Sequence, residues 1–231
     1  MEVGGGDTSL LIDMIEGDLT SIVIPEGVNK IGRNAFYNRL LLSSVQIPVD
    51  VSNIGIGAFA GCGSLRDIDL PEACTIISDG LFRECGSLAK FVVKNGVTEI
   101  GERAFENVST GISMAMLPTT PPILKENGKY VFGNSTMTWP IYVKNSVVDT
   151  YKNAGGNWND VSTRITPLAA IDYDASTYTV TAYGRDNVEL YVDASLCDSS
   201  VYTFVPDTID VSHNITVKSV DPSLGILDTV S

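Results

Sequence analysis

The sequence predicts a mainly β protein with short helical segments, in which a right-handed solenoid of about five coils precedes a small antiparallel β-sandwich. Two observations carry this prediction. A phenylalanine recurs every 23 residues from Phe36 to Phe105, and a fixed period of this length is the signature of stacked repeats. Residues 169–231 then change to short β-branched and aromatic runs between turns, which is typical of a sandwich.

Four successive units share the same apolar columns. Because one coil cannot bury its own apolar edge, the stack of coils is the stable unit. We expect the phenylalanines to form a continuous internal ladder, at roughly the 4.7–4.9 Å spacing of neighbouring strands. The columns are Leu19, Leu42, Leu65 and Leu88; Ile31, Ile54, Ile77 and Ile100; Phe36, Phe59, Phe82 and Phe105; and the closing prolines Pro25, Pro48 and Pro71.

Each coil is expected to contribute one short strand. In "LRDIDLP" the apolar Ile68 and Leu70 alternate inward, and Pro71 ends the strand because it lacks a backbone donor. The residues between the inward positions would face solvent and line one sheet face. By period these outward residues are Ser21 and Val23, Ser44 and Gln46, Asp67 and Asp69, Lys90 and Val92, and Ser113 and Ala115.

Small residues mark the side of the coil opposite the strand. A glycine follows the isoleucine in three of the four units, which predicts a tight bend or close packing between coils. An alanine precedes three of the four phenylalanines, and it is small enough to let the neighbouring coil approach.

The repeat resembles the bacterial surface-antigen class of leucine-rich repeats that is called BspA-like. The segments "IPEGVNKIGRNAFYNRLLLSSVQIP" and "IGIGAFAGCGSLRDIDLP" follow that family's order of I-P, I-G, A-F, C and L. The likeness covers roughly residues 19–117. It departs at Lys94, which replaces the proline, and in "ENVSTGISMAML", which lacks the cysteine and the leucine. The resemblance implies an extracellular or cell-surface protein used in adhesion and in host or matrix contact.

The period and its loss divide the chain into four segments. In "DTSLLIDMIEGDL" the leucines share one helical face with a methionine and an isoleucine, which predicts a short capping helix. After "TTPPIL" breaks the period, Ser146 and Asp149 predict a helix start, and Gly155 with Gly156 predicts its stop. The segments are 1–18, leader and N-terminal capping helix; 19–117, leucine-rich-repeat solenoid; 118–168, C-terminal cap; and 169–231, β-sandwich module.

Two further likenesses concern the last two segments. The pattern from Thr120 to Leu168 resembles the segments that commonly follow the last repeat in the BspA-like family. The run "VELYVDASLCDSSVYTFVPD" resembles Ig-like modules of bacterial surface and phage-associated proteins. The Cys-Trp-Cys pattern of antibody domains is absent, because residues 169–231 contain only Cys197 and no tryptophan.

The net charge of −13 argues against some classes of partner. Nucleic acids and anionic membranes attract cationic surfaces, so neither is an expected partner. No apolar run approaches the roughly 18 residues of a membrane span. The start "MEVGGGDTS" has neither the charged region nor the apolar region of a signal peptide. We therefore expect that an export signal, if the protein is secreted, has been removed.

The four cysteines leave two interpretations open. Cys62 and Cys85 are one period apart, so stacking would bring their Cα atoms within disulfide range. The alternative, which we favour, is that each is a small buried residue in a turn ladder. Cys74 and Cys197 have no evident partner, and closely spaced cysteine pairs of the zinc-binding kind are absent.

Candidate catalytic and metal residues are few. His213 is the only histidine, and we interpret it as an exposed structural residue. Asp67 and Asp69 form a carboxylate pair that could support acid–base chemistry, but solvated charges are common on such a face. Asp172 and Asp174 could begin a calcium site, but the acidic loop with glycine that would complete it does not follow. We expect no catalytic residue, no metal and no cofactor.

The sequence therefore predicts a non-enzymatic, bacterial cell-surface or secreted repeat protein that binds an extracellular protein, matrix component or glycan. Two alternatives remain: a structural spacer or phage-type appendage module, and a secreted β-solenoid enzyme that acts on glycans. We expect the ligand to contact the outward strand face. Its predicted residues are Ser44, Gln46, Asp67, Asp69, Lys90 and Val92.

Overall fold

A computed structural model of the protein describes residues 2–3, 19–134, 138–174, 179–184, 188–193, 195–197, 201–203, 215–219 and 226–230. The chain divides into a repeat unit, residues 1–141 and 150–165, and a C-terminal unit, residues 142–149 and 166–231. The N-terminal capping helix that the sequence predicts lies outside the described residues.

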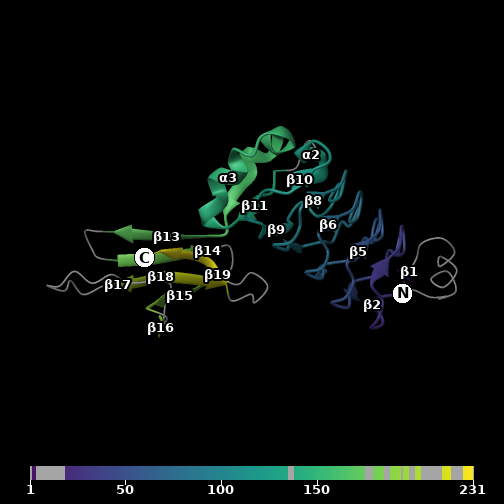
Figure 1. Cartoon of the computed structure of the whole chain (residues 1–231), viewed down its shortest axis with the longest axis horizontal. Coiled ribbons are helices and arrows are strands. Elements are labelled where there is room, and N and C mark those ends of the chain that lie inside the picture. The colour runs from purple at the N-terminus through teal and green to yellow at the C-terminus, as the bar shows by residue number, and fades with distance from the viewer. Residues whose placement is uncertain are drawn as a thin grey trace. The chain divides into compact units, whose positions relative to one another are not determined.

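The repeat unit is a stack of coils whose short strands fall into two columns (Figure 1). In the first column, parallel pairing follows the predicted 23-residue register, with Ser21 opposite Ser44 and Lys90 opposite Ser113. Its strands are β2 (Ser21–Val23), β4 (Ser44–Gln46), β7 (Lys90–Val93) and β9 (Ser113–Met116). The second column comprises β1 (Glu2–Val3), β3 (Lys30–Ile31), β5 (Asn53–Ile54), β6 (Ile76–Ile77), β8 (Glu99–Ile100) and β10 (Ile123–Leu124).

The second column contains the repeated isoleucines. The packing of its coils explains why glycine follows the isoleucine. Ile31 lies opposite Ile54 in a parallel pair, and both side chains are buried. A Cβ atom on Gly55 would lie 2.5 Å from the backbone nitrogen of Arg33 in the preceding coil, and one on Gly101 would meet the coil before it equally closely. The prediction of close packing between coils is confirmed. The strands themselves were not predicted, because two residues are too few to show an alternating pattern.

The phenylalanine ladder is confirmed. Phe36, Phe59, Phe82 and Phe105 are completely buried. Their rings stack with successive centroid distances of 5.2, 5.9 and 5.6 Å. Phe91 enters from β7 and packs its ring 5.0 Å from both Phe82 and Phe105. One continuous aromatic core therefore crosses the coils.

Two columns of residues with positive φ, which we call the left-handed columns, frame the phenylalanines. Each holds one residue per coil, with φ between 53° and 75°. Between them the backbone bonds directly from coil to coil: Phe36 N–H donates to Ala58 at 2.7 Å, and Phe59 N–H donates to Leu81 at 3.1 Å. The columns are Asn34, Gly57, Gly80 and Arg103, and Asn38, Gly61, Glu84 and Asn107.

The third coil departs from the prediction. Residues 66–70 form no strand, although Ile68 and Leu70 are buried and Asp67 and Asp69 are exposed, as the alternation requires. The expected strand in "LRDIDLP" is therefore wrong, while its inward and outward positions are correct. Two exposed aspartates two residues apart explain the loss, because Asp is among the residues least suited to strands.

The stack continues past residue 117, where the sequence analysis placed the start of the cap. β10 pairs in parallel with β8, with Ile123 opposite Glu99. The short helix α2 (Gly128–Val131) then brings Phe132 onto the ladder, 6.2 Å from Phe105 and nearly parallel to it. The 23-residue period fails here because the segment between the two phenylalanines is longer, although the stacking is kept.

Aromatic side chains close this end of the ladder. Trp158, on the 3₁₀ helix η2 (Gly156–Arg164), packs 5.5 Å from Phe132 and donates from its indole nitrogen to the Pro122 carbonyl at 2.8 Å. Arg164 donates to the carbonyl of Phe132 and lies 4.2 Å above the Trp139 ring. Burial lowers the pKa of Arg164 to about 10. The cap thus satisfies backbone carbonyls that the end of the stack would leave unpaired.

Short elements follow one another between residues 141 and 167. They are β11 (Ile141–Val143), the 3₁₀ turn η1 (Asn145–Val147), α3 (Val148–Lys152), η2 and β12 (Ile165–Pro167). The helix predicted from Ser146 is confirmed by η1 and α3. The longer η2 was not predicted, because Gly155 and Gly156 were interpreted as a stop.

The C-terminal unit contains two antiparallel sheets, in the strand orders β13-β14-β17 and β16-β15-β18-β19. Leu190 and Val217 lie opposite each other and are completely buried. The strands are β13 (Ala169–Asp174), β14 (Thr179–Gly184), β15 (Val188–Val192), β16 (Ser195–Leu196), β17 (Val201–Thr203), β18 (Ile215–Ser219) and β19 (Ile226–Val230). Within the described part of the chain, helices are too short to cross a membrane.

Candidate functional site

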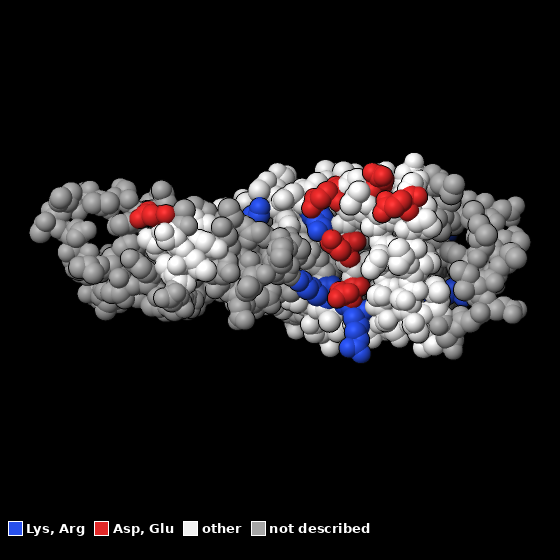
Figure 2. All heavy atoms as spheres, turned by 90° about the horizontal axis from the view of Figure 1, so that it is seen from below, with Lys and Arg blue, Asp and Glu red and all other residues white. Residues whose placement is uncertain are grey.

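Five of the six residues predicted to contact a ligand reach the surface. Ser44, Gln46, Asp67 and Asp69 are exposed, and Lys90 is half-buried. We call these five residues the strand face. They come from three neighbouring coils, so the fold brings together side chains that are up to 46 residues apart in the sequence. Figure 2, which views the molecule from below, shows acidic side chains gathered over the middle of the solenoid with basic side chains among them.

Val92 is the exception, and its assignment to the exposed face is wrong. Its side chain is only 7% exposed, and its pairing partner Ala115 is completely buried. The sequence explains why: β7 reads KFVV and β9 reads SMAM, without the alternation of a half-exposed strand. Near-continuous apolar strands are buried on both faces. The strand face therefore ends at Lys90.

Lys94 supplies a contact that the sequence analysis did not predict. It occupies the proline column and is 8% exposed. Its ammonium lies 2.8 Å from Asp69 Oδ1 and 3.9 Å from Glu72 Oε1. Buried charges are normally paired, so a lysine in place of the repeat's proline was the signal that could have revealed this ion pair. Lys94 fixes the Asp69 carboxylate to the neighbouring coil.

The geometry of Asp67 and Asp69 does not resemble an acid–base site. Both carboxylates lie on the open surface, and the Asp69 side chain is 75% exposed. Catalytic carboxylates act in sites that restrict water and hold their substrate between them. An exposed pair, one member of which is bound to a lysine, is better suited to contact with a partner's polar groups.

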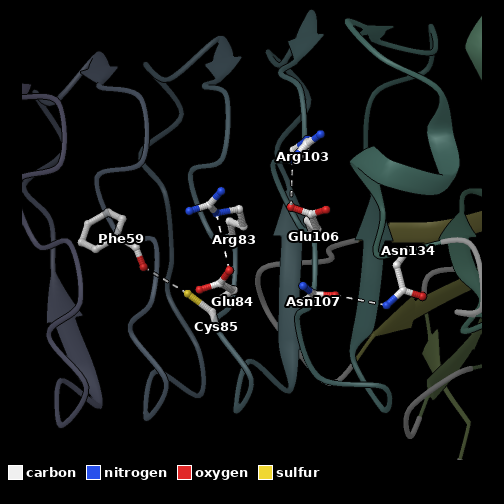
Figure 3. Close-up of polar contacts among 8 residues, drawn as sticks. All are labelled: Phe59, Arg83, Glu84, Cys85, Arg103, Glu106, Asn107 and Asn134. Atoms are coloured by element: carbon white, nitrogen blue, oxygen red, sulfur yellow. Dashed lines mark hydrogen bonds and ion pairs between the residues drawn. The ribbon is translucent and has the colours of Figure 1, made fainter.

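Cys62, Cys74 and Cys85 are buried, and none of the three is in a disulfide. Cys62 Sγ–H donates to the Phe36 carbonyl at 3.1 Å. Cys85 Sγ–H donates to the Phe59 carbonyl at 3.2 Å, the bond that Figure 3 shows. Burial raises the pKa of Cys62 to about 12 and also raises that of Cys85. Of the two interpretations, the structure therefore has buried thiols that bond to the preceding coil.

No group of three or more His, Cys, Asp or Glu side chains that could hold a metal occurs in the part of the chain that the structure describes. His213 lies outside the described residues. Asp172 and Asp174 are on β13, but their side chains lie outside the description. The structural interpretation of His213 and the calcium hypothesis for the two aspartates are therefore not tested.

The repeats are similar to those of known proteins. A family model described as "BspA type Leucine rich repeat region" matches residues 15–139 in six copies. No curated protein matches the chain. Solved structures with similar folds include a leucine-rich repeat protein from Bacteroides ovatus, 23% identical over 55% of this chain and 38% of that protein, with a TM-score of 0.43.

Two further solved structures are similar. A leucine-rich cell surface protein from Faecalibacterium prausnitzii is 28% identical, with a TM-score of 0.46, over 62% of this chain and 35% of that one. The leucine-rich repeat protein of T. pallidum is 27% identical, with a TM-score of 0.49, over 58% of this chain and 61% of that one. The chain thus spans less than two thirds of each of these proteins. The match of the repeat model to more than half of the residues shows that the chain belongs to the BspA type leucine-rich repeat family.

Proposed function

We propose that the protein is a non-enzymatic, extracellular or cell-surface repeat protein that binds a protein partner through the strand face. The observation that supports this most directly is the contrast between constant and variable positions. From coil to coil the inward columns keep the same residue types, whereas the outward positions change from Ser44 and Gln46 to Asp67 and Asp69. A scaffold can carry a specific surface in this way without a change to its core.

The strand face suits a protein contact better than a small-molecule pocket. Its side chains stand on neighbouring coils of a stiff stack, so little conformational entropy is lost when a partner binds. Lys94 also holds Asp69 in place. With only three coils contributing, the surface is small, and we expect a modest affinity that multivalent display would strengthen.

A binding screen on the full chain tests the proposal. Immobilised fibronectin, fibrinogen, laminin and collagen would serve as probes, and we expect saturable binding to at least one of them. The paired change Gln46→Lys and Asp67→Lys should then weaken that binding at least tenfold, about 1.4 kcal/mol, with unchanged thermal melting. Asp69 is left intact because its reversal would leave Lys94 beside a like charge.

The matched control is the paired change Val49→Lys and Asp50→Lys, an equal change of charge at two exposed turn residues outside the strand face. It should leave binding within twofold. Deletion of residues 169–231 should also keep most of the affinity. If the paired variant binds normally, or if the deletion abolishes binding, the strand face is not the contact. Absence of binding to every probe would favour the structural-spacer alternative.

A further inference from the structure

A groove with a volume of about 360 Å³ crosses four consecutive coils on the phenylalanine side of the solenoid. It shares no residue with the strand face. Small residues of the middle coils, Gly57, Ala60 and Gly80, line the groove between larger residues of the same columns. Ala60 lies between Tyr37 and Arg83 in one column, and the neighbouring left-handed column has glycine in both middle coils. The coils are otherwise equivalent, so this hollow is a property of the sequence rather than of the fold.

The charge of the groove differs from that of the chain. Arg33, Arg83 and Arg103 line it together with Asp79 and Glu102, which gives three positive against two negative charges. The whole chain carries a net charge of −13. Three guanidinium groups at one hollow of an acidic protein are a local concentration of positive charge that favours an anionic ligand.

Two of the arginines are only loosely engaged by neighbouring carboxylates. Arg83 Nε lies 3.9 Å from Glu84 Oε1, and Arg103 Nη1 lies 3.9 Å from Glu106 Oε2, as Figure 3 shows on adjacent coils. Such distances are too long for hydrogen bonds. A guanidinium has five donors in a planar fork that matches a carboxylate, so both groups can form stronger bonds to a ligand.

The floor of the groove cannot pair with a peptide backbone. Gly57 N–H donates to the Asp79 carbonyl at 3.0 Å, and Gly80 N–H donates to the Glu102 carbonyl at 2.7 Å. A peptide strand gains much of its affinity from free main-chain groups, and these groups are already used between coils. The ligand must therefore be recognised by side chains.

Arg103 adds an independent observation. It has φ of 53° in the left-handed column whose middle members are glycines. A side chain other than glycine is strained there. Asn34 in the same column and Glu84 in the other column adopt the same conformation, so it belongs to the repeat. Position 103, at the edge of the groove, is an arginine although a glycine there would make the folded protein more stable.

We propose that this groove binds an acidic oligosaccharide. The guanidinium groups of Arg83 and Arg103 bind its carboxylate, and the carboxylates of Asp79 and Glu102 accept from its hydroxyls. The ring of Tyr37, which is 44% exposed, packs against a sugar face. The volume lies at the small end of the range for ligand pockets, which fits a ligand of two or three sugar rings.

Titration calorimetry on the full chain tests the proposal with two carboxylate sugars, trigalacturonate and 3′-sialyllactose. We expect at least one to bind with a Kd of about 1 mM or tighter. The neutral counterparts, the methyl ester of trigalacturonate and lactose, should bind at least tenfold more weakly. Triglutamate, which offers carboxylates without sugar rings, should also bind at least tenfold more weakly. Failure of both acidic sugars, or equal binding by a counterpart or by triglutamate, would overturn the proposal.

Two variants locate the binding. Ile56→Glu places a negative charge at an exposed residue that lines the groove, and it should weaken binding at least tenfold. Ile76→Glu makes the same change at an exposed residue outside the lining and should leave binding unchanged. Arg103→Gly should weaken binding while it raises the melting temperature, a combination that a purely structural arginine would not give. Equal effects of the two glutamate variants would place the site elsewhere.

Discussion

The two sides of each coil differ in regularity. On the phenylalanine side, rings and backbone bonds continue from coil to coil through Phe36, Phe59, Phe82 and Phe105. On the strand side, residues 66–70 form no strand, although the Ala89 N–H still donates to the Arg66 carbonyl at 2.8 Å. The difference shows which interactions hold the stack together: a coil can lose its strand and stay in register, because the rings and turns on the other side still fix its position.

The largest expected effect comes from the ladder itself. Phe82→Ala should lower the free energy of unfolding by about 3–5 kcal/mol, because Phe82 packs against Phe59, Phe91 and Phe105 and is completely buried. Urea denaturation measures this change. Tyr37→Ala, at an exposed aromatic residue of the same side, should cost less than about 0.5 kcal/mol. Similar losses in the two variants would mean that the ladder is not the core.

Close packing between coils gives the second effect. Gly55→Ala should cost about 1–3 kcal/mol, because the new Cβ would lie 2.5 Å from the backbone of Arg33 and the backbone must move. Gly63→Ala is the matched control, since a Cβ there would meet nothing within 4 Å. Its stability should stay within about 0.5 kcal/mol of the parent. If both alanines are equally tolerated, the coils are not in backbone contact at Gly55.

The buried thiols make stability depend on pH. Burial favours the neutral thiol, so the folded protein keeps the Cys62 proton up to a pKa of about 12, above the ordinary value of 9.0. The stability from this group is fully present below about pH 9 and decreases as the pH rises, by at most about 1.4 kcal/mol per pH unit. Urea melts from pH 7 to 10.5 should show a smaller decrease for Cys62→Ala than for the parent. Parallel curves would show that this thiol does not titrate with unfolding.

A smaller effect distinguishes the two aspartates of the strand face. Asp69→Asn should cost about 1 kcal/mol, because it weakens the ion pair with the buried Lys94. Asp67→Asn removes the same charge from the same surface and should cost less than about 0.5 kcal/mol. Differential scanning calorimetry compares the two variants. If their melting temperatures agree, the Lys94 contact adds nothing to stability.

The period predicted what repetition alone determines: the phenylalanine ladder, the strand register and the stacked cysteines. It could not predict where one coil departs from the others. The burial of Val92 follows from the apolar residues of β7 and β9, and the loss of the strand at residues 66–70 follows from a local pair of aspartates. The ion pair of Lys94 is a similar case. The lysine in place of the proline indicates an ion pair, but it does not identify the partner, which is in the neighbouring coil.

The groove could not be predicted from the sequence either. Its residues belong to three columns of the repeat, and within any single coil they do not indicate a hollow. Only the stacking of coils places Ala60 between Tyr37 and Arg83. The left-handed columns were hidden for a related reason. Gly57 and Gly80 suggest positive φ, but Arg103 in the same column does not. Their shared conformation depends on the hydrogen bonds between coils rather than on residue preference.

Native-state hydrogen exchange tests the central claim most directly, because it compares the two sides of the coil in one unmodified protein. If the phenylalanine side holds the stack, the amides of Phe59 and Phe82 should exchange only through global unfolding. The amides of Asp67 and Asp69 should exchange through local opening, at least a hundredfold faster, about 2.7 kcal/mol lower in opening free energy. Equal protection of the two pairs would contradict the account, because it would mean that both sides of the coil open together.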